Sequence, residues 1–108
     1  MSKFSTSGKG FHLTFENGLT ISVQWGFGNY CSNKSMRWDE LEELQKNRTF
    51  NAETAEIAVW DASGKWMRFE HDVVKGWCTA DEVAEYICKV QNATSLEELH
   101  ESERIILE

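Results

Sequence analysis

The stretch from Phe11 to Trp25, FHLTFENGLTISVQW, constrains the fold of this chain more than any other part of it. Apolar and polar residues alternate along both of its halves, which is the pattern of two strands that each bury one side. An Asn-Gly pair separates the halves and indicates a reverse turn. The stretch is therefore predicted to form a β-hairpin on which the remaining elements pack.

The length of the turn decides which side chains share a side of this hairpin. A two-residue Asn17-Gly18 loop would place Phe15 opposite Thr20 and put the two apolar rows on different sides. A three-residue loop, residues 16–18, instead pairs Phe15 with Leu19, so both rows lie on one side. Its third residue must be left-handed, and glycine stands at that position. We therefore predict the three-residue loop.

A second hairpin is predicted for residues 54–71, TAEIAVWDASGKWMRFEH, because glycine again stands third in a three-residue loop. The register of this loop pairs Trp60 with Trp66 and Ile57 with Phe69. One side of the hairpin is apolar and is expected to be buried. That side carries Ala55, Ile57, Val59, Met67, Phe69 and His71, and the other carries Glu56, Ala58, Trp60, Trp66, Arg68 and Glu70.

Three segments carry helical signals. Residues 36–46 have apolar side chains at spacings of three behind a Ser35 cap. A capping box at Thr79–Glu82 begins a helix over about 80–91, and Ser95–Glu98 repeats the box. The predicted fold class is α+β: an antiparallel sheet of two β-hairpins with one packed helix, a short helix between the hairpins and an acidic C-terminal helix. We expect a single domain of 108 residues, with 1–9 as a frayed arm and 93–108 as an acidic tail.

The acidic charge of the chain is concentrated near its C-terminus. The net charge is −7, and residues 81–108 hold eight acids and two bases, which leaves −6 in that part. A protein that binds nucleic acid through phosphate neutralisation needs the opposite sign. We therefore expect no direct contact with DNA or RNA.

Three cysteines, Cys31, Cys78 and Cys88, cannot all pair, and none lies in a C-x-x-C spacing. Together with His12 and His71 they lack the spacing of zinc ligands, so we expect buried free thiols and no metal. The chain has no apolar run of about 18 residues, and we expect no signal peptide. These features favour a soluble protein of a reducing, intracellular compartment without a membrane partner.

Several of these segments carry a resemblance. With FHLTFENGLTISVQWG, Asn29-Tyr30-Cys31, TAEIAVWD and Gly76-Trp77-Cys78, the chain over about residues 10–91 resembles small uncharacterised proteins of tailed phages and prophages. The resemblance assigns no functional residue. It implies the host bacterial cytoplasm as the place of action, and accessory phage proteins of this size often inhibit host defence or host enzymes.

The predicted contact residues lie away from the predicted core. Aromatic and arginine side chains are the usual anchors of protein interfaces, so an exposed tryptophan pair beside an arginine favours protein binding. The alternative, that the 36–46 helix or the tail covers the pair, stays open. The acidic helix could also contact a partner by imitating a row of phosphates, or it could only solubilise the chain. The candidate protein-binding residues are Trp60, Trp66, Arg68, Glu97, Glu98 and Glu101, while Trp25, Trp38 and Trp77 are expected to anchor the core or loops.

The expected function is that of a phage-encoded accessory protein that inhibits a host bacterial protein, such as an RNA-guided nuclease complex, by occupying its surface. One alternative is a sponge that sequesters a nucleotide signal, with Phe27, Asn29 and Tyr30 for the base and Arg68 or Lys75 for phosphate. A second is a phage structural or assembly protein, for which homo-oligomerisation would be the sign. The predicted Glu56–Glu70 opposition, which could serve as an acid and base, is more typical of a solvated edge, so we expect no enzyme and no cofactor.

Overall fold

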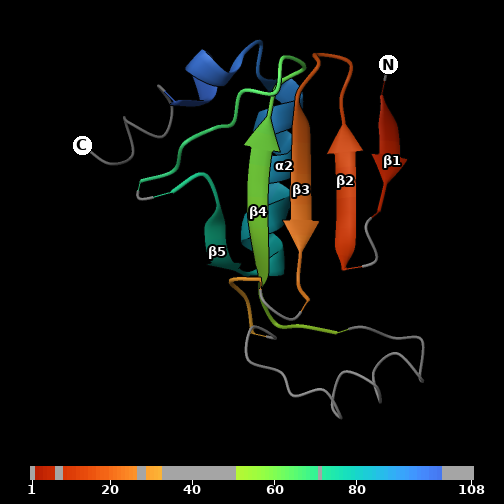
Figure 1. Cartoon of the computed structure of the whole chain (residues 1–108), viewed down its shortest axis with the longest axis vertical. Coiled ribbons are helices and arrows are strands. Elements are labelled where there is room, and N and C mark those ends of the chain that lie inside the picture. The colour runs from red at the N-terminus through yellow and green to blue at the C-terminus, as the bar shows by residue number, and fades with distance from the viewer. Residues whose placement is uncertain (1, 7–8, 27–28, 33–50, 71, 101–108) are drawn as a thin grey trace.

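The computed structural model describes residues 2–6, 9–26, 29–32, 51–70 and 72–100. Within these ranges the strands form one antiparallel sheet in chain order, and α2 (Ala80–Asn92) lies against one face of it (Figure 1). A short helix follows at residues 96–100. This arrangement confirms the predicted α+β class, while the predicted helix at 36–46 lies outside the described residues. The strands are β1 (Lys3–Ser5), β2 (Gly10–Thr14), β3 (Thr20–Gln24), β4 (Ala55–Trp60) and β5 (Lys75–Cys78).

The first hairpin has the predicted turn and register. The backbone N–H of Phe15 donates to the carbonyl of Leu19 at 2.9 Å, and Gly18 N–H donates to the Phe15 carbonyl at 3.0 Å. Gly18 has a φ of +87°, the left-handed value that the third loop position requires. Leu13 stands opposite Ile21, so both apolar rows face the same side of the sheet.

The second hairpin is confirmed only near its turn. Gly64 is left-handed at φ +87°, and Trp60 stands opposite Trp66 as predicted. The predicted pairing of Ile57 with Phe69 is wrong, because Ile57 pairs with Lys75 of β5.

After Met67 the chain turns away from β4. Phe69 N–H donates to the Asp72 carbonyl at 2.7 Å, and the Phe69 ring enters the core against Tyr86, with ring centroids 5.8 Å apart. β5, a strand that the sequence pattern did not predict, then completes the pairing of β4. The predicted opposition of Glu56 and Glu70 is therefore also wrong.

The core lies between α2 and the sheet face that bears the apolar rows. The capping box is present as predicted, with Glu82 N–H donating to Thr79 Oγ1 at 3.2 Å and Thr79 N–H donating to Glu82 Oε1 at 3.0 Å. The side of the second hairpin predicted to be buried is buried, except that position 71 lies outside the described residues. The core consists of Leu19, Ile21, Val23, Ala55, Ile57, Val59, Met67, Phe69, Cys78, Val83, Tyr86, Val90, Ala93, Leu96 and Leu99.

Both ends of the described chain join this architecture. Residues 3–5, predicted to belong to a frayed arm, form β1 on the edge of the sheet beside β2, which corrects that prediction. The short helix docks through Leu96 and Leu99, which are 1% and 4% exposed. Its cap is a variant of the predicted box, because Glu98 N–H donates to Ser95 Oγ while the Glu98 carboxylate accepts from Thr94 N–H.

Candidate functional site: the tryptophan face

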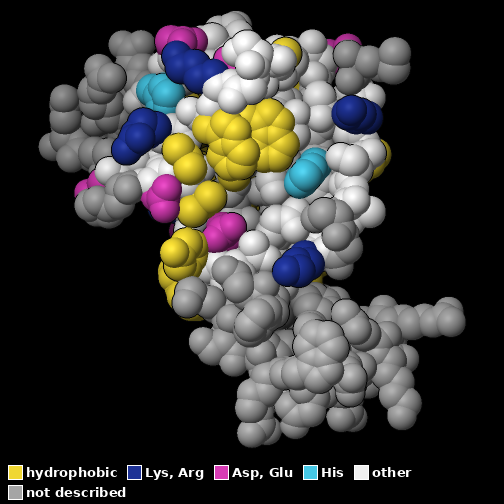
Figure 2. All heavy atoms as spheres, viewed as in Figure 1, with side chains coloured by type: hydrophobic (Ala, Val, Ile, Leu, Met, Phe, Trp, Pro, Cys, Tyr) yellow, Lys and Arg dark blue, Asp and Glu magenta, His cyan; other side chains and the backbone are white. Residues whose placement is uncertain are grey.

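The candidate site lies on the sheet face opposite α2. Figure 1 shows α2 behind the sheet, and Figure 2, in the same view, shows hydrophobic side chains gathered on the front of the molecule. The rings of Trp60 and Trp66 lie 4.9 Å apart with an interplanar angle of 32°. The imidazole of His12 meets the Trp60 ring edge to face at 5.3 Å and 86°. We call the surface formed by His12, Trp60 and Trp66 the tryptophan face.

Small side chains on the central strands make room for these rings. Thr20 and Ser22 on β3 stand opposite Trp60 and His12 on the neighbouring strands, and all four point to the same side of the sheet. Because the β3 side chains are short, the indole and the imidazole can meet across that strand. Thr20, Ser22 and Ala58 are only 6–7% exposed, as expected for a floor beneath larger rings.

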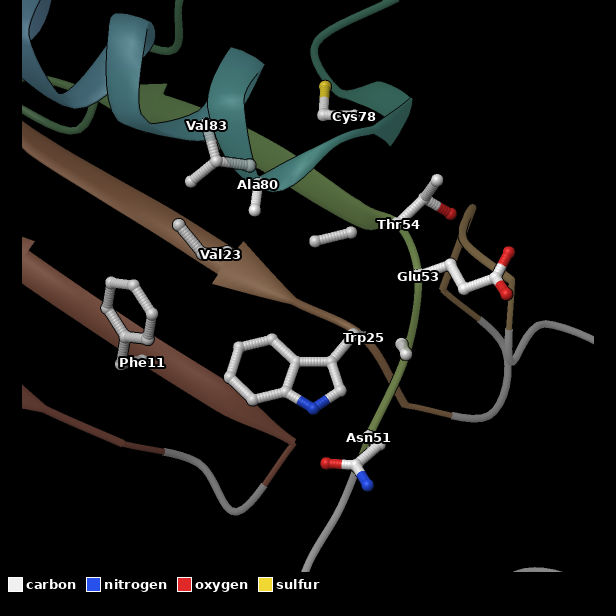
Figure 3. A pocket seen from close by; sticks show the side chains of 11 residues that line it. Phe11, Val23, Trp25, Asn51, Glu53, Thr54, Cys78, Ala80 and Val83 are labelled. Carbon is white, nitrogen blue, oxygen red and sulfur yellow. The ribbon is translucent and has the colours of Figure 1, made fainter.

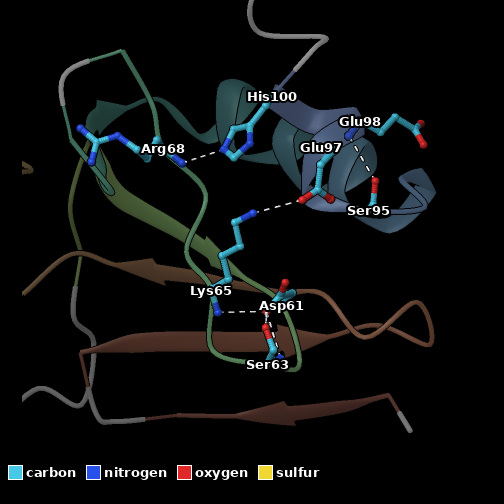
Figure 4. A network of polar contacts seen from close by, with 8 residues as sticks. All are labelled: Asp61, Ser63, Lys65, Arg68, Ser95, Glu97, Glu98 and His100. Carbon is cyan, nitrogen blue, oxygen red and sulfur yellow. Dashed lines mark hydrogen bonds and ion pairs between the residues drawn. The ribbon is translucent and has the colours of Figure 1, made fainter.

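A polar turn fixes the two indoles against each other. Asp61 Oδ1 accepts hydrogen bonds from Ser63 Oγ at 2.7 Å, from Lys65 N–H at 2.9 Å and from Ser63 N–H at 3.0 Å (Figure 4). The Ser63 hydroxyl, followed by the Lys65 N–H, lowers the pKa of Asp61 below its ordinary value. The carboxylate therefore stays ionised and holds the loop between Trp60 and Trp66 in one conformation.

The short helix braces the arm that carries Trp66. Lys65 Nζ lies 3.1 Å from Glu97 Oε1, and Arg68 N–H donates to His100 Nε2 at 2.9 Å (Figure 4). The guanidinium of Arg68 points away from the short helix in the same view. Trp66 remains 43% exposed. The described part of the tail thus supports this arm from behind and leaves its indole accessible.

The predicted acidic contact residues have partners within the chain. Glu97 contacts Lys65, and its pKa is lowered first by its own backbone N–H and then by Lys65. Glu98 accepts from the Thr94 hydroxyl at 2.5 Å, and this bond lowers its pKa. Glu101 lies outside the described residues. The two described carboxylates therefore serve the short helix and its contact with the second hairpin.

Two of the residues predicted to bind a nucleotide, Asn29 and Tyr30, form hydrogen bonds that hold the loop after β3 in place. Asn29 Oδ1 accepts from Gly26 N–H at 3.0 Å, while its Nδ2 donates to Glu56 Oε1 at 3.3 Å. Tyr30 N–H donates to Glu56 Oε2 at 2.8 Å. The carboxylate of Glu56 thus holds the loop to β4, and its negative charge stands where a phosphate would be repelled. Phe27 lies outside the described residues, and Lys75 pairs with β4 through its backbone.

Trp77 differs most from its prediction. Its indole is 56% exposed, and its φ of +58° is left-handed, which is rare for a bulky residue. Trp77 N–H donates to the Tyr30 carbonyl at 2.8 Å, and a Cβ at Gly76 would lie 2.6 Å from the Cβ of Tyr30. Trp77 is therefore a surface residue held by its backbone. Trp25, in contrast, packs edge to face on Phe11 at 6.1 Å and confirms its expected place beside the core, while Trp38 lies outside the described residues.

A groove of about 310 Å³ opens on the other side of the sheet, near the start of α2 (Figure 3). Phe11, Val23 and Trp25 line it from the sheet, and Ala80 and Val83 line it from the helix. Asn51, Glu53 and Thr54 add polar groups to the lining. The groove is mainly apolar and belongs to a different surface from the tryptophan face.

The thiols follow the prediction at two of three positions. Cys31 and Cys78 are buried, whereas Cys88 is exposed, which corrects the expectation for that residue. Burial raises the pKa of Cys78 to about 11. Among the residues that the structure describes, no three histidine, cysteine, aspartate or glutamate side chains gather so that they could hold a metal ion.

Comparison of this chain with protein-family models, with curated proteins and with solved structures gave no match. The resemblance to small phage proteins therefore stays a prediction. Within the described ranges, no helix combines the length and the apolar character needed to cross a bilayer.

Proposed function

We propose that this chain is a binding protein and that the tryptophan face is its contact surface for another protein. The observation that carries the proposal is the Trp60–Trp66 pair, held at 4.9 Å on the sheet face that α2 does not cover. Tryptophan is strongly enriched among the residues that dominate binding energy at protein interfaces. Because the turn and the short helix already fix the arm, little conformational entropy is lost when a partner binds.

The chemistry of this surface defines the kind of partner. The indoles and the small side chains beneath them are uncharged, so they suit an apolar or aromatic side chain of the partner. Arg68 follows Trp66 by two residues and exposes a guanidinium, which binds a carboxylate well. We therefore propose a protein partner that inserts an apolar side chain at the indoles and places an acidic residue near Arg68.

The proposed partner is a bacterial protein, and the proposed effect is inhibition by occupation of its surface. The support for this part is the sequence resemblance to small phage proteins. The geometry adds that the contact surface is preformed, as expected of an inhibitor that binds without a conformational change.

Affinity capture from bacterial lysate, followed by measurement of binding to the purified candidate, tests the proposal. The tagged full chain is compared with Trp60→Ala/Trp66→Ala and with Trp77→Ala, which removes an exposed indole outside the tryptophan face. We expect the double variant to lose the partner and to weaken binding at least tenfold, while Trp77→Ala binds like the wild type.

Circular dichroism and urea unfolding show whether each variant is folded. If the double variant is unfolded, Trp66→Ala and Arg68→Glu serve instead, because both side chains are exposed. A folded variant that still binds its partner with wild-type affinity would contradict the proposed contact surface.

A further inference from the structure

The hydrogen bond from Arg68 to His100 requires one protonation state of the imidazole. The backbone N–H of Arg68 donates to His100 Nε2 at 2.9 Å, and Figure 4 shows the ring turned from the short helix toward this backbone. A ring nitrogen accepts a hydrogen bond only when it carries no proton. The ring of His100 is therefore neutral in this contact, with its proton on Nδ1.

We propose that His100 is a pH-sensitive switch: the neutral ring holds the short helix to residues 65–69, the arm that carries Trp66, and the protonated ring releases them. In the protonated ring both nitrogens carry a hydrogen. Arg68 N–H and Nε2–H would then be two donors placed 2.9 Å apart, with no acceptor between them. Imidazole ordinarily changes its charge roughly between pH 5 and 8, which is where we expect the contact to be lost.

The charges on the short helix would draw a protonated ring away from the arm. Glu97 stands three residues before His100, so the two side chains lie on the same face of the helix. The pKa of Glu97 is lowered first by its own backbone N–H, then by Lys65 and also by His100, so its carboxylate lies within electrostatic reach of the ring. Glu98 is bound to Thr94 instead. Glu97 is therefore the carboxylate that a positively charged ring would approach.

The elements next to the short helix carry more positive than negative charge near the ring. Lys65 and Arg68 are the cations of the arm, and Glu70, two residues beyond Arg68, is the carboxylate of its continuation. On α2, Lys89 is the basic residue of the last turn. A protonated His100 would therefore be repelled from the side of the arm and attracted to its own helix.

The ion pair between the short helix and the arm depends on the same carboxylate. Lys65 Nζ lies 3.1 Å from Glu97 Oε1, and the two side chains are 58% and 70% exposed. Such a pair is weak in water, so a second cation beside the carboxylate competes with it readily. Protonation of His100 would thus weaken both the hydrogen bond and the ion pair that join the helix to the arm in Figure 4.

The change should stay local, because apolar contacts hold the surrounding elements in place. Leu96 and Leu99 keep the short helix in the core, at 1% and 4% exposure. Met67 is fully buried, and its backbone N–H donates to the Val59 carbonyl at 2.7 Å. The switch therefore acts on the outward side of the arm, where Arg68 N–H loses its acceptor and the exposed side chains lose their support.

The consequence for binding rests on the proposed function. The tryptophan face is preformed because the turn and the short helix hold the arm, and a released arm must be ordered again when a partner binds. Acidification from about pH 7.5 to about pH 5 should therefore weaken partner binding several-fold in the wild type. His100→Gln should lack this dependence, because an amide oxygen accepts a hydrogen bond at either pH.

Amide hydrogen exchange of the full chain, followed by NMR without any partner, tests the switch itself. Between about pH 7.5 and about pH 5 we expect the protection factor of the Arg68 amide to fall at least tenfold. The Met67 amide, which is bound to a backbone carbonyl, is the internal control and should keep its protection. His100→Gln should keep the Arg68 amide protected at both pH values. His100→Lys, which has no acceptor, should leave it unprotected at both.

A wild-type Arg68 amide that is equally protected at both pH values would overturn the inference. Equal losses at Arg68 and Met67 would also overturn it, because acid would then unfold the region as a whole. So would a His100→Gln variant, folded by circular dichroism, that loses the Arg68 protection in acid like the wild type. If the exchange results hold but partner binding responds to pH equally in wild type and His100→Gln, the switch stands and its link to the tryptophan face fails.

Discussion

The side-chain amide of Asn17, in the turn between β2 and β3, donates to the backbone carbonyl of Val90 at 2.8 Å and so joins the first hairpin to the end of α2. The same nitrogen donates to the Ala93 carbonyl at 2.8 Å, and the Gln91 carbonyl, 3.2 Å away, shares one of its two hydrogens. Asn17 Oδ1 accepts from Leu19 N–H at 2.9 Å. One side chain thus completes its own turn and binds carbonyls at the C-terminal end of α2, where helix carbonyls lack i+4 partners.

Replacing Asn17 should destabilise the fold, and the loss should be larger where the new side chain repels the helix carbonyls that the Asn17 amide binds. We expect Asn17→Ala to lower the free energy of unfolding by about 1–2 kcal/mol, because these hydrogen bonds are lost. Asn17→Asp keeps the acceptor for Leu19 but turns a carboxylate toward the negative end of the helix dipole, so it should be less stable than Asn17→Ala. Urea unfolding at pH 7 measures both, and equal stability of the two variants would contradict this role.

The capping box of α2 should make stability depend on pH. The Thr79 backbone N–H, followed by the Thr79 hydroxyl, lowers the pKa of Glu82 from its ordinary 4.5. A carboxylate with a lowered folded-state pKa stabilises the fold above its unfolded pKa, and this contribution disappears as the pH falls through the folded value. Glu82→Gln should therefore be less stable than wild type at pH 7.

The difference between wild type and Glu82→Gln should begin to shrink as the pH falls below 4.5, where the unfolded chain binds a proton, and should disappear below the lower folded-state pKa, where the carboxylate is protonated in both states. Thr79→Ala should lower the free energy of unfolding by about 1 kcal/mol at pH 7. Urea titrations at several pH values check both expectations. A Glu82→Gln deficit that stays constant down to the lowest pH at which the chain folds would show that the charge is unimportant.

The thiols should differ strongly in reactivity. Cys88 is exposed on α2, whereas Cys78 is 1% exposed and burial raises its pKa to about 11. Alkylation requires an accessible thiolate, so at pH 8 iodoacetamide should label Cys88 at least tenfold faster than Cys31 or Cys78. Peptide mass spectrometry measures the three rates, and labelling in urea supplies the control. Equal rates in the folded chain would contradict the described burial.

Position 77 should favour glycine over alanine, because its backbone is left-handed. A left-handed residue with a Cβ costs about 1–2 kcal/mol, which glycine avoids. Trp77→Gly should therefore be more stable than Trp77→Ala by about 1 kcal/mol. At Trp66, whose φ is not positive, the alanine variant should be the more stable one. The pairwise differences follow from urea unfolding, and the same order at both positions would argue against strain at Trp77.

The parts of the fold that follow from local chemistry were predictable from the sequence. Gly18 and Gly64 each stand where a three-residue loop needs a left-handed residue, and that requirement fixed the register next to each turn. The Thr79–Glu82 box likewise fixed the start of α2. Such signals lie within a few residues of each other, so no knowledge of the distant chain is needed.

The pairing of β4 with β5 depends on a contact that alternation alone does not reveal. The alternation of the second hairpin continues past Met67, but the chain turns there: Phe69 N–H bonds to the Asp72 carbonyl, and the Phe69 ring packs on Tyr86. β5 is short and contains the irregular Trp77, which weakens any strand pattern. The edge strand β1 was missed because a three-residue segment with one apolar residue has little pattern to recognise.

The candidate site was predicted in part. Trp60 and Trp66 flank one turn, so the local register placed them together on the side opposite the core. His12 was missed because its contact with Trp60 crosses β3 and requires the pairing of β3 with β4. The brace from His100 to the Arg68 backbone joins residues 32 positions apart and leaves no periodic signal in the sequence.

The tryptophan face and α2 lie on opposite sides of a single sheet (Figure 1). A partner bound at the indoles would therefore leave the groove beside α2 open. One copy of the chain could thus hold a protein on one side while a second molecule enters from the other, and the sheet between them would keep the two contacts separate.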